Sequence, residues 1–192
     1  MWSELKRALL FTVSTMLLFG VAYPIVVWGV AQTAFPAQAE GSMVRRADGT
    51  VVGSSLIAQG FTAPEYFHPR PSAVDYNAAA TGGSNYGPSN ADHLKLVRER
   101  RDAVAAENGV RPPAVPSELV TASGGGLDPH VPPAAIDLQV GRVARARNVT
   151  ADDLRAFVRE HTEGPLWGIF GRSRVNVLEL NLALDERVQA KK

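Results

Sequence analysis

The sequence has 192 residues, a mass of 20.6 kDa, and 45% hydrophobic against 20% charged residues. These values indicate about one globular domain and exclude wholesale disorder. The 20 Lys and Arg residues nearly balance the 19 Asp and Glu residues, so a nucleic-acid partner is not expected, and the absence of cysteine excludes disulfides, iron–sulfur clusters and thiol catalysis.

An uncharged apolar segment covers residues 8–31, and a stretch of about 20 apolar residues is long enough to cross a bilayer. A cleaved signal peptide is the alternative, because Ala37-Gln38-Ala39 resembles a cleavage site, but the apolar part of a signal peptide usually has only ~7–15 residues. We therefore predict a retained transmembrane helix, preceded by residues 1–7 and followed by a linker over residues 32–41.

The charges beside this segment predict its orientation. Lys6 and Arg7 directly precede it, whereas the next basic residues, Arg45 and Arg46, lie well beyond its other end. The positive-inside rule then places residues 1–7 in the cytoplasm and a soluble domain, residues 42–192, outside. Because residues 40–192 are formally neutral, strong attraction to an anionic lipid surface is not expected.

Three residues suggest that the span contacts more than lipid. Pro24 should kink the helix and leave a backbone carbonyl without its usual donor. Gly20 and Gly29 give small surfaces that allow close approach of another helix. The segment is either a simple anchor or an anchor that docks against other membrane helices.

The first part of the soluble domain shows a hairpin followed by a long irregular segment. Residues 43–53 read as two short strands joined by an Asp48-Gly49 turn. Residues 61–88 are rich in Pro, Gly and Asn, which excludes a long helix, and the aromatic residues within them indicate a packed loop.

Capping residues predict three helices in the second part. One begins after Asn90 and ends before Gly109, one is opened by Pro132-Pro133, and one begins after Thr150 and is ended by Gly164-Pro165. Residues 175–188 fit both a strand and a helix, and we favour a helix because the run exceeds a typical strand length. The predicted fold class is α+β.

Common catalytic and metal-binding motifs are absent from the sequence. It contains no P-loop, no Gly-x-Ser-x-Gly and no His-Glu-x-x-His, and its four histidines lack metal-ligand spacing. We predict no catalytic residue and no metal site. An extracytoplasmic hydrolase that uses scattered Ser, His and Asp residues, or a small-ligand-binding module, remains an alternative.

Two segments carry more specific composition than ordinary loops, residues 66–73 and residues 121–130. The second contains Ser123, Gly124, Gly125 and Gly126, whose backbone amides could surround an anion. A tight glycine turn is the simpler interpretation of that run.

The chain resembles the C subunit of the bacterial Kdp-type potassium-transporting P-type ATPase. The resemblance spans nearly the whole chain, and its small departures are Gly125 and Ala58. The stretches that carry it are residues 53–59, 66–73, 82–90, 119–130, 139–147 and 174–181.

The resemblance implies an accessory subunit of a high-affinity potassium uptake complex in the bacterial plasma membrane. Its partners would be a channel-like subunit that translocates potassium and a P-type ATPase subunit that hydrolyses ATP. This chain lacks the Asp-Lys-Thr-Gly motif of the phosphorylated subunit. Its implied roles are to stabilise the assembly and to act as a catalytic chaperone that raises the ATP affinity of the ATPase subunit.

The implied role in ATP affinity conflicts with the predicted orientation, because a domain outside the cell cannot touch cytoplasmic ATP. Either the effect passes through the membrane subunits, or the orientation is inverted. No cofactor of its own is expected. If ATP is bound directly, we expect the binding residues to be Ser123, Gly124, Gly125, Gly126 and Gln139, with the glycine amides on phosphate and the Gln139 amide as donor and acceptor.

Overall fold

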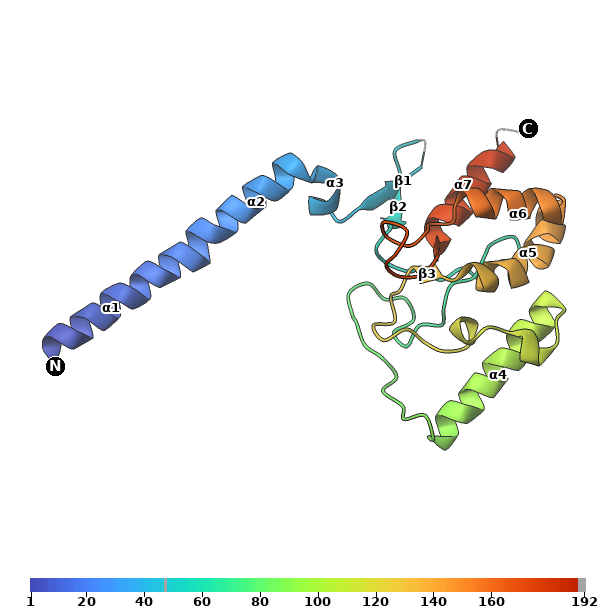
Figure 1. Ribbon diagram of the computed structural model, residues 1–192, viewed down its shortest axis with the longest axis horizontal. Coiled ribbons are helices and arrows are strands. Elements are labelled where there is room, and N and C mark those ends of the chain that lie inside the picture. Colours follow the sequence, from blue (N-terminus) through green and yellow to red (C-terminus); the bar gives the residue numbers. More distant parts are fainter. Residues whose placement is uncertain (47, 190–192) are drawn as a thin grey trace. The chain divides into compact units, whose positions relative to one another are not determined.

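A computed structural model describes residues 1–46 and 48–189 of the chain (Figure 1). The chain divides into two compact units between Met43 and Val44. The first unit is the apolar N-terminal helix with its short extension, and the second is the mixed helical and stranded domain.

The first unit contains one nearly continuous helix. It consists of α1 (Trp2–Leu17), a π-helical turn (Leu18–Ala22) and α2 (Tyr23–Ala34), and a short α3 (Pro36–Ala39) follows. The 33 residues of Trp2–Ala34 are apolar and long enough to cross a membrane, none of the most apolar stretch is buried, and no second such helix occurs within the described residues. The helix therefore extends beyond the predicted residues 8–31 at both ends.

The π-helical turn shows how the helix accommodates Pro24. The Tyr23 N–H donates to the Leu18 carbonyl, five residues earlier. The wider turn lies where the proline ring would otherwise crowd the Gly20 carbonyl. A methyl group added at Gly20 or Gly29 would meet nothing within 4 Å. Helix packing at Gly20, Pro24 and Gly29 stays a prediction.

The second unit begins with the predicted hairpin, formed by β1 (Met43–Arg45) and β2 (Val51–Ser54). In the turn, the Thr50 N–H donates to Asp48 Oδ1 at 2.8 Å, and Gly49 has a φ of +85°. No helix or strand interrupts residues 61–88, which confirms the loop. Of its aromatic residues, Phe67 is fully buried and Tyr86 is exposed.

Helix α4 (Ala91–Asn108) has both predicted ends. Asn90 accepts a hydrogen bond from the His93 N–H, and the helix stops at Gly109, which has a φ of +68°. The left-handed conformation at this stop suits glycine because it has no Cβ. Two 3₁₀ turns, Pro112–Ala114 and Ser117–Leu119, follow.

The core lies among α5 (Pro133–Arg147), α6 (Ala151–Glu160) and α7 (Val177–Gln189). The predicted starts of α5 and α6 are confirmed, since Pro132 caps α5 and the Thr150 side chain accepts from the Asp153 N–H. The helix α6 ends at Glu160, four residues before the predicted stop. The fully buried core side chains include Phe67, Val131, Ile136, Val140, Val143, Val175 and Leu180.

Two very short strands were not predicted. They are β3 (His130–Val131) and β4 (Val175–Asn176), which pair antiparallel with His130 opposite Asn176. Two residues carry too little alternation to be recognised in a sequence. The ambiguous C-terminal run is mainly helical, as favoured, and the α+β class is confirmed.

Candidate functional site

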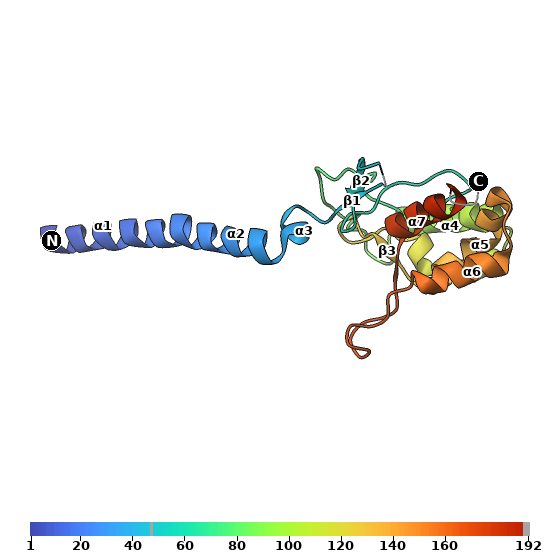
Figure 2. The same ribbon diagram turned by 90° about the horizontal axis from the view of Figure 1, so that it is seen from above.

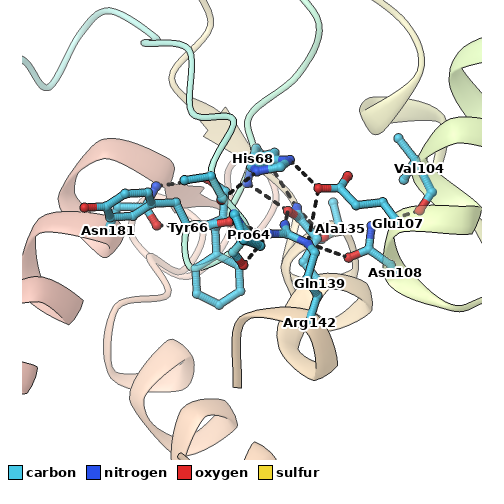
Figure 3. A network of polar contacts seen from close by, with 12 residues as sticks. Pro64, Tyr66, His68, Val104, Glu107, Asn108, Ala135, Gln139, Arg142 and Asn181 are labelled. Atoms are coloured by element: carbon cyan, nitrogen blue, oxygen red, sulfur yellow. Dashed lines mark hydrogen bonds and ion pairs between the residues drawn. The ribbon is translucent and has the colours of Figure 1, made fainter. Parts of the chain in front are cut away.

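A stretch outside the helices and strands begins with a turn, in which the Tyr66 N–H donates to the Ala63 carbonyl at 3.1 Å, and continues through the fully buried Phe67. We call residues 64–68 the clamped segment. Its backbone is bonded by side chains from α5 and α7 (Figure 3). Buried backbone groups require partners, and here helices supply them in place of a neighbouring strand.

The side chains of Arg142 and Gln139 on α5 bond one edge of the clamped segment. Arg142 donates to the Pro64 and Tyr66 carbonyls at 2.7 and 2.9 Å. The Gln139 amide accepts from the His68 N–H at 2.8 Å and donates to the His68 carbonyl at 3.1 Å. This paired contact reproduces the two hydrogen bonds that a neighbouring strand would make.

The other edge is bonded by Asn181 on α7 and Arg147 at the end of α5. The Asn181 amide accepts from the Phe67 N–H and donates to the Phe67 carbonyl, both at 2.9 Å. Arg147 donates to the Glu65 carbonyl at 2.7 Å. Side chains from two helices thus bond the backbone of consecutive residues in this segment.

The Arg142 guanidinium also ties the segment to α4. Its Nε donates to Asn108 Oδ1 at 3.1 Å, and its Nη2 donates to Gln139 Oε1 at 2.7 Å. The side chain is only 5% exposed, and Glu107 Oε1 lies 3.6 Å from its Nε. A buried cation therefore has a nearby carboxylate and four hydrogen-bond acceptors, which compensate for its loss of water.

His68 lies beside the same two charged groups. Its Nδ1 is 3.4 Å from Glu107 Oε1, and its Nε2 is 3.2 Å from the Ala63 carbonyl. Burial lowers the pKa of His68, and the positive charge of Arg142 lowers it further, against smaller opposing effects of the hydrogen bond to the Ala63 carbonyl and of Glu107. The folded chain therefore favours the neutral imidazole.

This lowered pKa predicts a loss of stability in acid. Below the ordinary histidine pKa of about 6.5 the unfolded chain takes up a proton that the folded chain resists. The contribution of neutral His68 to the free energy of unfolding is therefore complete above about pH 6.5 and decreases as the pH falls towards the pKa of His68 in the folded chain. Urea unfolding of the parent chain and of His68→Gln between pH 5 and 7.5 measures it, and the variant should show a shallower decrease. Equal slopes for the two chains would contradict the prediction.

The structure uses Gln139, one of the predicted nucleotide-binding residues, inside the domain. Its side chain is 1% exposed. Besides bonding His68 and Arg142, its Nε2 donates to the Ala135 carbonyl at 3.0 Å. Both atoms of the amide are thus occupied by groups of the protein.

The predicted Ser123 to Gly126 run forms a turn that packs against another part of the long loop. Ser123 is buried, and its carbonyl accepts from the Gly126 N–H. The Gly125 carbonyl accepts from the Gly82 N–H, and the Gly126 carbonyl accepts from the Ser72 hydroxyl. Gly124 and Gly125 are exposed. The turn contacts residues 72–82, whereas Gln139 contacts His68, so the two predicted parts meet different stretches of the loop.

A small pocket lies on the α7 side of the clamped segment, with a volume of about 210 Å³. Among its polar lining residues, Tyr66 donates to Asp185 at 3.0 Å, and Arg147 contacts Asp185 at 2.7 Å. The other polar residues of the lining are Arg46, Gln59 and Asn181. In the described part of the chain, no group of three or more His, Asp or Glu residues could hold a metal ion.

We call the four side chains that bond the clamped segment the clamp: Gln139, Arg142, Arg147 and Asn181. The sequence analysis did not select Arg142, Arg147 or Asn181 as functional residues. The sequence does contain a signal for Asn181. This residue lies four residues after Val177 and three before Leu184, on an apolar helical stripe. A polar residue in such a position requires a buried partner. The stretches 66–73, 139–147 and 174–181, which carried the family resemblance, all contribute to the clamp.

Comparisons with known proteins identify the family of the chain. The family described as KdpC, K⁺-transporting ATPase c chain, matches residues 5–186. Potassium-transporting ATPase KdpC subunits from Cereibacter sphaeroides and Gloeobacter violaceus are 50% and 51% identical to the chain, over 96% and 86% of it and 98% and 87% of their own lengths. The subunit from Polaromonas naphthalenivorans is 52% identical over 94% of the chain and 93% of its length. The chain therefore belongs to the KdpC family, the c chain of the K⁺-transporting ATPase.

Proposed function

We propose that the chain is an accessory, non-catalytic subunit that stabilises the assembly of a high-affinity, ATP-driven potassium uptake complex. The observation that carries the proposal is the clamp. Stretches that carry the family resemblance direct polar side chains into internal hydrogen bonds, as Gln139, Arg142 and Asn181 do. Such groups build a rigid body for presentation to partners and leave little for chemistry.

The proposed partners are the potassium-translocating, channel-like subunit and the P-type ATPase subunit. The exposed apolar surface of Trp2–Ala34 supports a single-pass position in the plasma membrane among other helices, with Gly20, Pro24 and Gly29 at the contacts. Lys6 and Arg7 at the start of the helix support a cytoplasmic N-terminus and a domain outside.

We further propose that the chain raises the ATP affinity of the ATPase subunit indirectly, through the membrane subunits. Two observations support an indirect effect over direct nucleotide contact. The Gln139 amide is buried and fully bonded, and the Ser123 side chain lies inside its own turn.

Co-expression with both partner subunits tests these proposals. With an affinity tag on the ATPase subunit, the chain should co-purify, and omitting the chain should lower the yield of intact complex and raise the ATP concentration for half-maximal activity. Gly124→Ala is the matched variant for indirect coupling, since a methyl group there meets nothing within 4 Å. It should leave the ATP dependence unchanged.

The outcomes separate the two proposals. Failure of the chain to co-purify would contradict the assembly role. A clear shift of the ATP dependence in Gly124→Ala, in a complex that still assembles, would contradict indirect coupling and favour nucleotide contact at the glycine turn.

A further inference from the structure

The segment between α6 and α7 forms a hairpin that extends away from the helices (Figure 2). Glu163 and Arg174 exchange two backbone hydrogen bonds near its base and form an ion pair at 2.9 Å. Farther out, the Leu166 N–H donates to the Phe170 carbonyl at 2.8 Å and the Phe170 N–H returns a bond at 3.0 Å. The end of the hairpin thus has a defined conformation.

Large apolar side chains cluster at this end, residues 166–170, which we call the apolar tip. Leu166 is 62% exposed, Trp167 81%, Ile169 78% and Phe170 60%. Single exposed apolar residues are normal, but a contiguous group indicates a surface that another molecule covers. The hydrogen bonds of the clamp do not explain why these apolar side chains are exposed.

The backbone of the tip is strained in a way that displays Trp167. Trp167 has a φ of +53° and Gly168 a φ of +76°. Glycine and asparagine adopt this left-handed region readily, whereas a bulky residue is an outlier there. Such outliers gather at binding sites, where the contact offsets the strain. The Trp167 and Phe170 rings pack edge to face, with centroids 6.2 Å apart, so the exposed group is preformed.

The area of the tip argues against a second copy of the chain as its occupant. From the size of aromatic and aliphatic side chains, the four exposed groups offer on the order of 500 Å². A stable interface requires about 800 Å² from each partner. Two copies that met only through their tips would therefore form a weak contact.

A lipid surface also fits poorly. Residues 40–192 are formally neutral, and Arg174, one of the two arginines beside the tip, is paired with Glu163. Attraction to anionic lipid usually requires a cluster of 4–8 basic residues. A fluid bilayer, moreover, does not require a preformed, strained Trp167.

A small preformed anchor suits a partner to which the chain is already held. A second contact within one assembly has an effective concentration near the millimolar range, so a few buried aromatic groups suffice. We infer that the apolar tip inserts into an apolar socket on a membrane subunit of the same potassium-transporting complex, with Trp167 as the central anchor. This inference rests on the proposed assembly function.

The absence of cysteine allows a direct test with one thiol. Ile169→Cys is expressed with and without the partner subunits, and membranes opened to both sides are treated with a polymer-linked maleimide that shifts this chain on a gel. The thiol should react at least tenfold more slowly when the partners are present. Leu56→Cys, at another apolar position that is 62% exposed, reports the general accessibility of the domain.

Two results would overturn the inference. Fast reaction of Ile169→Cys in a complex that retains the chain would show an unoccupied tip and leave the assembly role intact. Slow reaction in the absence of partners would assign the tip to lipid. Loss of the chain from the purified complex, by contrast, would contradict the proposed function itself.

Substitution of the anchor gives a second readout. Trp167→Asn keeps a residue that tolerates positive φ, so the unfolding temperature of the free chain should not fall. The fraction of chain retained by the tagged complex in detergent should fall about tenfold, while Leu56→Asn should keep parental retention. Parental retention of Trp167→Asn would overturn the role of Trp167 as anchor.

Discussion

Arg142→Met is expected to lower the free energy of unfolding by about 3–5 kcal/mol. Methionine occupies much of the same volume but donates no hydrogen bond, so the Pro64 carbonyl, the Tyr66 carbonyl and Asn108 Oδ1 lose their Arg142 donor. Each buried polar group left without a partner costs about 1–3 kcal/mol. Urea unfolding of the full chain in detergent, followed by circular dichroism, measures the loss.

Arg145→Met is the matched control, since Arg145 lies on the same helix and is exposed. Surface substitutions usually change stability by no more than about 0.5 kcal/mol, so this variant should unfold like the parent. A similar loss in both variants would show that the effect comes from the helix and not from the clamp. The destabilised Arg142→Met chain should also co-purify less well, because partners would meet a less rigid body.

The elements that the sequence predicted well are those with local signals. Asn90 and Gly109 bound α4, and Thr150 opens α6, because a cap requires only residues within one turn of the helix. The loop over residues 61–88 was equally predictable, since its composition excludes regular structure. The strands β3 and β4 were missed because their pairing joins residues far apart in the chain.

The clamp was only partly predictable for the same reason. Gln139 was selected from the sequence as a possible nucleotide ligand, and the structure shows its amide bonded to His68, 71 residues earlier. Composition and periodicity reveal a polar residue on an apolar stripe, but they do not reveal which distant backbone completes its hydrogen bonds. The family resemblance indicated that residues 66–73, 139–147 and 174–181 matter, and the fold supplies the physical reason that they occur together.

Asn181→Leu is expected to cost about 2–4 kcal/mol, because the N–H and carbonyl of Phe67 both lose their Asn181 partner. The added apolar volume of leucine offsets only part of this cost. Glu186→Leu, at an exposed position of the same helix, should leave the urea midpoint nearly unchanged. A parental midpoint for Asn181→Leu would contradict the pairing.

Asn181→Asp tests the same contact with nearly the same shape. An ionised carboxylate can accept from the Phe67 N–H but cannot donate to the Phe67 carbonyl, and the site is 1% exposed. Burial raises the pKa of such a carboxyl above its ordinary value of about 4, and the protonated form can both accept and donate. The contribution of this site to the stability of the variant should therefore be greatest in acid and should decrease as the pH rises through that raised pKa. Both chains keep His68 and its loss of stability in acid, so the effect of the substitution is the difference between their pH profiles, which should widen as the pH rises. Parallel pH profiles would show that the side chain at position 181 does not bond the Phe67 backbone.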